Sequence, residues 1–529
     1  MRARTLKQRL EQDFAKAPDI YYFPDAMPRN KMYYGYRRDN KLDDFLIDDI
    51  TWNDLGMDNV FKRINACESS SGEQYLYYML RSPAVSEDGY NERAEAIETM
   101  EKDPGLRLKL QVIFAKLGRN RYADVSQSFS PSKRSPKMLI VYLALAVSLI
   151  ASALSLIFTM AAVPFLIGLF VFNSLLHAHM SQKMKVELAT VNYSVGMIVA
   201  AKRIEKLKSP KLQEMLEPMY AALGRLKAVL KVGGVTTSDS DQLVGFVVSV
   251  LLLDLISFEY LKNKLGRHHE DMFKLHEYLG MTDAAISVAS YRKSISGYVL
   301  PELNFSAAKD SYFIGKDMRH PLISSPVPNS IELSGSALVT GSNASGKSTF
   351  LKTAALNAVL AQSICTALCS QYRGSAFRIF SSMALTDNLL AGESYYITEI
   401  KSLKRIIDRA EKGERIICFV DEVLRGTNTI ERIAASCEIL AGFGKMDMVC
   451  IAATHDIELC ALLADKFVQY HFEEHITDEG MLFDYKLRDG AAASRNAIKL
   501  LGIMGFDEKL VERADMRAEE YMKSGHWLS

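Results

Sequence analysis

Residues 138–176 form one apolar run, MLIVYLALAVSLIASALSLIFTMAAVPFLIGLFVFNSLL, that contains no charged side chain. A helix in a soluble core is rarely longer than about 20 residues and normally carries a polar face. The run is long enough for two membrane spans of about 19 residues each. We expect these spans over 138–156 and 158–176, with a turn near Thr159 to Pro164. The alternative is a buried hairpin within a large helical domain or a dimer.

Basic residues flank this run on both sides, with Lys133, Arg134 and Lys137 before it and Lys183 and Lys185 after it. Because basic flanks stay on the cytoplasmic side, a hairpin with both ends inside satisfies this preference at each end. We therefore predict a protein of the cell membrane with the remaining chain in the cytoplasm. A second apolar stretch, 243–256, is too short to span a membrane and contains an acid near its end, so we expect a buried helix there.

Composition limits the remaining classes of function. A chain of 529 residues is too long for one core and suggests about three or four units. The net charge is +1, with 64 basic and 63 acidic residues, so contacts with nucleic acid or anionic lipid must use local patches. The seven cysteines are scattered without a CxxC pair, which fits a reducing compartment, and we expect Cys365 and Cys369 to be core thiols. Residues 1–16 are charged throughout, so no signal peptide is expected there.

Apolar periodicity divides the chain into two kinds of structure. Residues 40–118 and 178–300 repeat apolar side chains at helical spacing, and 126–136 is a polar linker that leads into the hairpin. From about residue 310, short apolar strands alternate with helices, as in a parallel α/β sheet. The sequence therefore predicts a multidomain protein, mainly helical at first and α/β at its C-terminal end.

A phosphate-binding motif lies in the α/β part. Residues 341–348, GSNASGKS, fit G-x-x-x-x-G-K-[ST], after the strand-like run 337–340 and before a helix-like run at 349–356. Glycines let backbone N–H groups turn toward a polyphosphate, and the helix adds its positive N-terminal dipole. Lys347 would reach the β- and γ-phosphates, and the Ser348 hydroxyl would lie on Mg²⁺. The motif predicts a bound nucleotide.

Two later strands end in polar residues that suit the same site. Residues 416–420 lead into Asp421 and Glu422, where an Asp can approach Mg²⁺ and a Glu can act as general base on water. Residues 448–453 lead toward His455, which can sense a phosphate or polarise water. The competing interpretations are a solvated turn after the first strand and a structural histidine after the second. Ser394, in the first turn of an expected helix, offers another anion-binding N-terminus, although an ordinary capped helix has the same pattern.

Together these segments resemble the MutS family of ATPases. The resemblance rests on GSNASGKSTFLK, DNLLAGESYYITEI, FVDEVLRGTNTIER, ATHDIEL, Arg319-His320-Pro321 and the tail DGAAASRNAIKLLGIMGFDEKLVERA. In the helical part, LIDDITWNDL, INACESSSGEQYLYYMLRSP, RAEAIETM and LHEYLGMTDAAISVASY are similar to the family's core and lever regions. The resemblance to this family implies five regions along the chain. They are an N-terminal segment (1–40), the first part of a core domain (41–125), a linker and hairpin (126–180), a second lever and core part (181–305), and an ABC-like P-loop ATPase domain with dimerisation helices (306–529).

The resemblance also implies roles for single residues. ATP would be held by the phosphate loop and by the partner subunit's Ser394, because the family works as dimers with composite sites. The loop residues implied to contact the nucleotide are Gly341, Asn343, Ser345, Gly346, Lys347, Ser348 and Thr349. Ser348 and Asp421 would bind Mg²⁺, and Glu422, His455 and Lys347 would be the catalytic residues. Nucleotide would close a homodimer and hydrolysis would release it.

Several features depart from the family's pattern. Only residues 1–40 precede the core region, and they lack the Phe-x-Glu motif with which mismatch-recognising members wedge DNA. Ser394 is followed by Tyr395-Tyr396 where the family has Thr-Phe. We therefore expect an ATPase that opens and closes helical arms without wedge-type mismatch recognition. DNA remains a possible partner, with AAKRIEKLKSPK at 200–211 as a candidate contact, although a solvated helix face has the same composition.

Two other functions fit parts of the pattern. A transport ATPase of the ABC type shares the logic of the nucleotide site, but it predicts an LSGGQ-like segment and more membrane spans than one hairpin supplies. A membrane-tethered, ATP-dependent switch that acts on a partner other than DNA is the remaining alternative.

Overall fold

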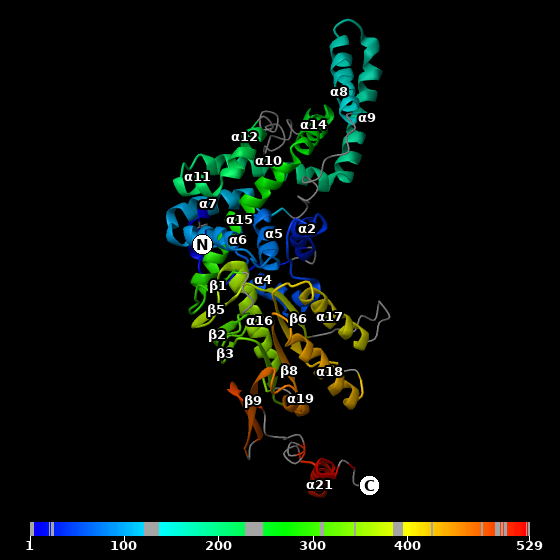
Figure 1. Cartoon of the computed structure of the whole chain (residues 1–529). Coiled ribbons are helices and arrows are strands. Elements are labelled where there is room, and N and C mark those ends of the chain that lie inside the picture. Colours follow the sequence, from blue (N-terminus) through cyan, green and yellow to red (C-terminus); the bar gives the residue numbers. More distant parts are fainter. Residues whose placement is uncertain are drawn as a thin grey trace. The chain divides into compact units, whose positions relative to one another are not determined.

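The computed structural model describes residues 5–20, 22, 26–120, 137–227, 247–306, 311–342, 345–383, 395–424, 427–477, 480–491, 498, 501, 505–524 and 526. The chain forms two compact units (Figure 1). The first comprises Met1–Asp44, Phe61–Met79 and Glu92–Ser294; the second comprises Phe45–Val60, Leu80–Asn91 and Ile295–Ser529. The domain boundaries given above stay predictions.

The part before residue 295 is helical, as predicted. Its helices in chain order are α1 (Leu6–Asp13), α2 (Ala26–Asp39), α3 (Asp49–Asp54), α4 (Met57–Ile64), α5 (Ser70–Arg81), α6 (Glu87–Lys102), α7 (Pro104–Leu117), α8 (Lys137–Ser155), the 3₁₀ turn η2 (Met160–Ala162), α9 (Val163–Lys183), α10 (Lys185–Glu205), α11 (Pro210–Met215), α12 (Glu217–Leu226), α14 (Leu253–Arg267) and α15 (His269–Ser294). Local chemistry fixes several of the helix starts. Asp103, for example, accepts a hydrogen bond from the Leu106 N–H at 2.8 Å, and Pro104 occupies the first turn of α7.

Helix α15 is the centre of the first unit, and most of its residues from Leu275 to Arg292 are buried. It packs against α7, α10 and α12. It also approaches α5 closely, because a Cβ at Gly280 would come 2.7 Å from the Ser71 carbonyl oxygen. Only a glycine allows that approach.

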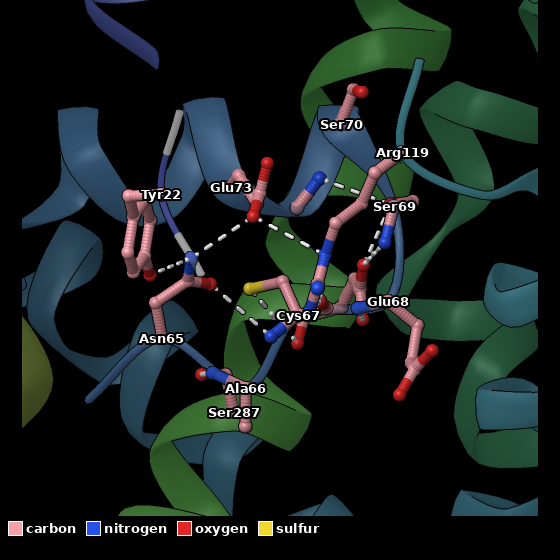
Figure 2. Close-up of polar contacts among 12 residues, drawn as sticks. Tyr22, Asn65, Ala66, Cys67, Glu68, Ser69, Ser70, Glu73, Arg119 and Ser287 are labelled. Carbon is pink, nitrogen blue, oxygen red and sulfur yellow. Dashed lines mark hydrogen bonds and ion pairs between the residues drawn. The ribbon is translucent and has the colours of Figure 1, made fainter. Parts of the chain in front are cut away.

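A buried polar network holds the turn that leads into α5 (Figure 2). Asn65 donates to the Tyr22 hydroxyl at 2.8 Å and to Glu73 at 3.1 Å. The Arg119 guanidinium lies 3.2 Å from Glu73 and donates to the Cys67 carbonyl oxygen at 3.0 Å. Burial raises the pKa of Glu73, and Arg119 acts in the opposite direction. Asn65 and Arg119 both bind Oε1 of Glu73 and so offset part of the cost of burying its carboxyl group.

Asp283 on α15 completes this network from the other side. Its carboxylate accepts from the Ser69 hydroxyl at 2.6 Å and from the backbone N–H groups of Ser69 and Glu68 at 2.9 and 3.3 Å. Burial raises the pKa of Asp283 to about 7, and these hydrogen bonds oppose the shift. The carboxyl thus ties α15 to the residues that precede α5.

The apolar run folds as a helical hairpin, in which α8 and α9 lie side by side (Figure 1). Among the described residues, Lys137–Ser155 and Met160–Lys183 are long and apolar enough to cross a membrane, by length and composition alone. The most apolar 18-residue stretches of these two segments have mean hydropathies of 2.3 and 1.8, and only 22% and 6% of the residues in those stretches are buried. Two helices with a turn between them are confirmed, although α9 begins at Val163 rather than at residue 158 and continues to Lys183, beyond the predicted end at 176.

The second unit contains two sheets and their covering helices. The strands are β1 (Glu302–Asn304), β2 (Phe313–Met318), β3 (Asn329–Leu333), β4 (Ser336–Thr340), β5 (Gln371–Ser375), β6 (Arg378–Ser382), β7 (Ile416–Asp421), β8 (Met448–Thr454), β9 (Phe467–Thr477) and β10 (Gly480–Asp489). The helices are α16 (Lys347–Ile364), α17 (Tyr395–Ala410), α18 (Thr429–Phe443), α19 (Ile457–Leu462) and α21 (Glu508–Ser524). Figure 1 shows α16 on one side of β6 and β8 and α17 and α18 on the other.

The larger sheet has the order β10-β9-β4-β8-β7-β6, and all its neighbours are parallel except β10, which pairs antiparallel with β9. Every residue of β4, β7 and β8 is buried, as expected for parallel strands with both faces covered. The smaller sheet, β1-β5-β2-β3, is mixed. The expected α/β region is therefore present with mixed sheets, and the carboxyl ends of β4, β8 and β7 lie next to one another.

Candidate functional site

The loop after β4 requires glycine at two positions. Gly341 and Gly346 have φ angles of +146° and +109°, which side chains rarely adopt. A Cβ at Gly341 would lie 2.9 Å from the Ser345 hydroxyl and 3.0 Å from the Phe472 carbonyl oxygen. The first and sixth residues of the motif are therefore glycines for a local steric reason.

Lys347 begins α16 and turns back over the loop. Its side-chain Nζ donates to the carbonyl oxygens of Gly341 and Ser342, both at 2.7 Å, and the residue is only 4% exposed. A buried ammonium held by neutral carbonyls has a stronger partner available in an anion. Ser348 and Thr349 follow in the first turn of α16 and are exposed.

Two serines of the loop differ in their partners. The Ser342 hydroxyl donates to Glu474 on the neighbouring strand β9. The Ser345 hydroxyl is buried and has no hydrogen-bond partner among the described residues. Asn343, which the resemblance placed on the nucleotide, lies outside the described residues.

Asp421 and Glu422 come at the end of β7. Asp421 is buried and pairs in register with Ala453 of β8. Glu422 adopts a left-handed φ of +55°, and its N–H donates to the Ala453 carbonyl oxygen at 2.9 Å. A left-handed conformation in a residue other than glycine is uncommon and often marks a functional position.

His455 follows β8 and faces Glu422. Its Nδ1 lies 3.5 Å from Glu422 Oε1, and its Nε2 lies 3.8 Å from Asp456 Oδ1. The interaction with Glu422 is the largest cause that raises the pKa of His455, and partial burial opposes it. Arg432 donates to Asp456 at 2.6 Å and fixes the residue next to the imidazole.

An open cavity of about 520 Å³ joins these elements. Gly346, Lys347, Ser348, Thr349 and Glu422 line it, so the structure brings most of the predicted loop residues and the predicted base to one cavity. Asp421 and His455 lie beside it at neighbouring strand ends rather than among its lining residues.

A second wall of the cavity was not singled out as a site from the sequence. It consists of His320, Ile323, Ser325, Pro326, Val327, Asn329, Phe472 and Tyr485. Burial lowers the pKa of His320, and Lys352 adds to that shift, which favours a neutral imidazole. Arg319-His320-Pro321 was noted only as part of the family resemblance, and Tyr485 had no sequence signal.

Tyr485 reaches the loop from a β-bulge in β10. Its φ is +56°, and its ring would lie 3.2 Å from a Cβ at Gly346. Asn329 holds the bulge by donating to the Tyr485 carbonyl oxygen at 2.9 Å and accepting from the Leu487 N–H at 2.7 Å. Such side-chain bonds across two strands cannot be inferred from local sequence.

The residues present fit a nucleoside triphosphate and a magnesium ion. The glycine cradle leaves room where a Cβ would clash, Lys347 supplies a buried cation, and Ser345 supplies a buried hydroxyl without a partner among the described residues. Ser348 and Asp421 offer the hard oxygen ligands that Mg²⁺ prefers. Among the described residues, no cluster of three His, Cys, Asp or Glu side chains is arranged to hold a metal. Ser394 lies outside the part of the chain that the structure describes.

Comparison with known proteins places the second unit in a family context. A family model described as MutS domain V matches residues 337–522. The chain is similar to proteins named DNA mismatch repair protein MutS from Fervidobacterium nodosum (29% identical over 50% of this chain), Natronomonas pharaonis (33% over 37%) and Methanosarcina barkeri (27% over 50%). The matched parts span 33%, 24% and 30% of these relatives' own lengths.

Proposed function

Because the chain belongs to the MutS family, with domain V at residues 337–522, we propose that it binds ATP in the cavity beside α16 and hydrolyses it with Mg²⁺. One observation carries the proposal: a single cavity joins Lys347 of the phosphate loop to Glu422 at the end of β7. An ammonium for the phosphates and a carboxylate for water are the two side chains that the reaction needs most.

The loop residues bind and orient the phosphates in this proposal. Lys347 exchanges its two carbonyl partners for phosphate oxygens, and backbone N–H groups at the start of α16 point at the same anion. The Ser348 hydroxyl and the Asp421 carboxylate hold Mg²⁺, which would neutralise charge on the phosphates. Thr349 adds a second hydroxyl to the cavity lining near the loop.

Glu422 and His455 act on water in this proposal. Glu422 lies in the cavity wall and accepts the proton from the attacking water, while His455 stabilises the carboxylate from 3.5 Å away. The raised pKa of His455 means that Glu422 faces an imidazole with an increased tendency to hold a proton. His455 is thus a positioning and electrostatic partner of the base.

The second wall suits the base and ribose of the nucleotide. Ile323, Val327 and Tyr485 offer apolar and aromatic surface, and the neutral ring of His320 adds a flat face. Tyr485 and Phe472 lie against Gly346, so the aromatic part of this wall borders the phosphate loop directly.

A homodimer with composite sites is the assembly that we propose. The named relatives are DNA mismatch repair proteins, and the family resemblance described above implies dimers. The partner subunit's Ser394 would then reach the γ-phosphate. ATP would favour the closed dimer because it binds two surfaces there, and hydrolysis would remove that preference.

We further propose that the hairpin anchors the protein in the cell membrane, with the ATPase domain in the cytoplasm. Its support is the length of α8 and α9 and their exposed apolar surface. The most exposed members of that surface are Ile140, Val147, Leu154, Ile157, Phe158, Met160, Phe165 and Leu175. Exposed apolar area of this extent is unfavourable in water. The protein should sediment with membranes, resist high-salt and alkaline extraction, and enter detergent; release by salt alone would contradict the anchor.

DNA is the binding partner that the names of the relatives suggest. Lys202, Arg203 and Lys206 are exposed near the C-terminal end of α10, at spacing that places them on neighbouring positions of one helix. Phosphate contacts by such residues predict binding that weakens steeply as salt rises. Replacing all three by glutamine should weaken duplex binding and lower its salt dependence; unchanged binding would exclude this face.

The test of the ATPase proposal is Glu422→Gln, assayed by phosphate release from the full-length protein in detergent with Mg²⁺. Loss of a general base should lower turnover about 10²- to 10⁴-fold while ATP still binds. Glu438→Gln, at an exposed position on α18, is the matched control and should keep full turnover. Equal turnover of Glu422→Gln and the control would refute the role of Glu422.

A further inference from the structure

A short apolar segment, residues 247–252, lies against the hairpin. It is helical over 247–250, turns at Leu251 and Leu252, and continues as α14 from Leu253. Leu252 adopts a left-handed φ of +54° at this break. The sequence predicted one buried helix over 243–256; the described part of that stretch is instead a broken helix, and Val247 is 50% exposed.

Asn173 binds the broken segment to α9. The side chain is fully buried in the middle of α9, directly after the apolar residues 163–172, and its Nδ2 donates to the Val250 carbonyl oxygen at 3.1 Å. A helix break frees carbonyl groups from their usual partners, and a membrane interior offers no water to replace them. Asn173 supplies the missing donor at the position of the break.

A second polar contact repeats this connection one turn later on α9. His177 Nε2 lies 2.7 Å from Asp254 Oδ2, and the Ser181 hydroxyl lies 3.2 Å from the same nitrogen. Asn173, His177 and Ser181 follow each other at intervals of four residues and therefore lie along one stripe of α9. Asn173 and His177 share one face of α9 and contact Val250 and Asp254, on either side of the helix break, which indicates a specific packing interface.

Apolar contacts complete the interface on both sides of these polar groups. Tyr142, Leu252 and Leu255 form a buried cluster, against which Leu145, Leu176, Met180 and Ile256 pack. Farther along the hairpin, an open groove of about 410 Å³ runs between α8, α9 and the segment. Its lining is entirely apolar: Leu149, Ile150, Ala153, Leu166, Ile167, Phe170, Val247, Val250 and Leu251.

The position of Asn173 sets the depth of this contact. The ten residues from Asn173 to the basic Lys183 at the end of α9 rise about 15 Å along a helix, which is about half of a hydrocarbon core of ~30 Å. If Lys183 marks the membrane surface, the Asn173–Val250 contact lies near the bilayer centre. The groove residues Leu166 and Ile167 lie deeper still.

We propose that residues 247–252 are a third membrane-embedded segment, which lies in the bilayer beside the hairpin and forms with it a groove for a lipid acyl chain. The inference rests on the membrane anchor proposed above. An acyl chain is the occupant because Ile150, Ile167 and Val247 line the groove and are themselves exposed, so the groove is continuous with the lipid-facing surface of the hairpin. The segment leads directly into α14 and then α15, so it would connect the membrane to the core of the helical unit.

The test is photolabelling of the full-length protein in vesicles that contain a phosphatidylcholine with a photoreactive group in its acyl chain. Lipid adducts mapped by mass spectrometry should fall on α8, on α9 and on 247–252, and not on the buried α15. Adducts on the hairpin without any on 247–252 would overturn this inference and leave the anchor intact. A hairpin without adducts would refute the anchor itself, and this inference with it.

A variant separates the segment's attachment from the hairpin's insertion. Asn173→Leu removes the donor to Val250, so adducts on 247–252 should fall at least about threefold relative to those on α8. Ser174→Ala is the matched control, because Ser174 is partly exposed and its hydroxyl donates within α9, to the Phe170 carbonyl oxygen at 2.8 Å. An unchanged adduct ratio in Asn173→Leu would show that Asn173 does not hold the segment.

Discussion

Replacing Lys347 by methionine isolates the contribution of one ammonium to nucleotide binding. Methionine keeps the length and apolar stem of the side chain, so the packing at the start of α16 is largely preserved. The Nζ atom, with its two hydrogen bonds of 2.7 Å to Gly341 and Ser342, is lost. The change therefore affects the charge and its donors more than the shape of the loop.

The size of the effect follows from the exchange of hydrogen-bond partners. On binding, Nζ would trade two neutral carbonyls for anionic phosphate oxygens, and a bond between two charged groups is roughly twice as strong as a neutral one. With the new bonds worth about 1.5–3 kcal/mol each and the bonds they replace about half as strong, each exchange gains about 0.75–1.5 kcal/mol, and the two exchanges gain about 1.5–3 kcal/mol. Since 1.4 kcal/mol is a factor of ten, the Kd for ATP should rise roughly 10- to 150-fold.

The assay is equilibrium binding of a fluorescent ATP analogue to full-length protein in detergent, with a thermal melt to establish that the variant is folded. Lys445→Met is the matched control, because Lys445 is exposed and lies outside the cavity lining. A folded Lys347→Met protein whose Kd stays within threefold of wild type would refute the assignment of Lys347.

Three further predictions concern strain and protonation. Gly346 has a φ of +109°, and a Cβ added there would lie 3.2 Å from the Tyr485 ring, so Gly346→Ala should lower the free energy of unfolding by about 1–3 kcal/mol and weaken ATP binding. Gly442→Ala is the control, because a Cβ at Gly442 meets open space and should have neither effect. The pKa of His455, measured by NMR, should lie above 6.5 in wild type and should fall in Glu422→Gln. Because the pKa of His455 is raised in the folded protein, the stability that this residue contributes is present below pH 6.5 and is lost as pH rises through the folded-state pKa. The pKa of Asp283 is about 7 in the folded protein and 3.8 ordinarily, so the free energy of unfolding of wild type should fall by on the order of 4 kcal/mol between pH 4 and 7. If the stability of Asp283→Asn falls with pH as steeply as that of wild type, this prediction is contradicted.

The loop and strand ends were predictable because their chemistry is local. Gly341 and Gly346 are required by backbone geometry within eight residues, and Lys347 follows in the same motif. Asp421 and His455 could be placed near the loop because parallel strands present their carboxyl ends at one edge of a sheet. The pattern of apolar strands therefore predicts both the sheet and much of the candidate site.

Contacts between distant segments were not predictable in the same way. The Asp54 carboxylate accepts from the Ser381 hydroxyl at 2.7 Å and from the Met383 N–H at 3.0 Å, which draws residues 45–60 into the α/β unit. Tyr485 joins the cavity only through a β-bulge that Asn329 holds from another strand. The smaller sheet has the same origin, since β5 lies between β1 and β2 although it follows both in the chain. None of these partners leaves a periodic signal in the sequence.

The central claim is that ATP occupies the cavity between the phosphate loop and the wall formed by His320, Ile323, Val327 and Tyr485. Photolabelling with 8-azido-ATP and Mg²⁺, followed by peptide mapping, tests it directly. We predict label on the peptides that carry these wall residues, competed by ATP and lost in Lys347→Met. Label confined to peptides outside the cavity, or label that ATP does not displace, would contradict the claim.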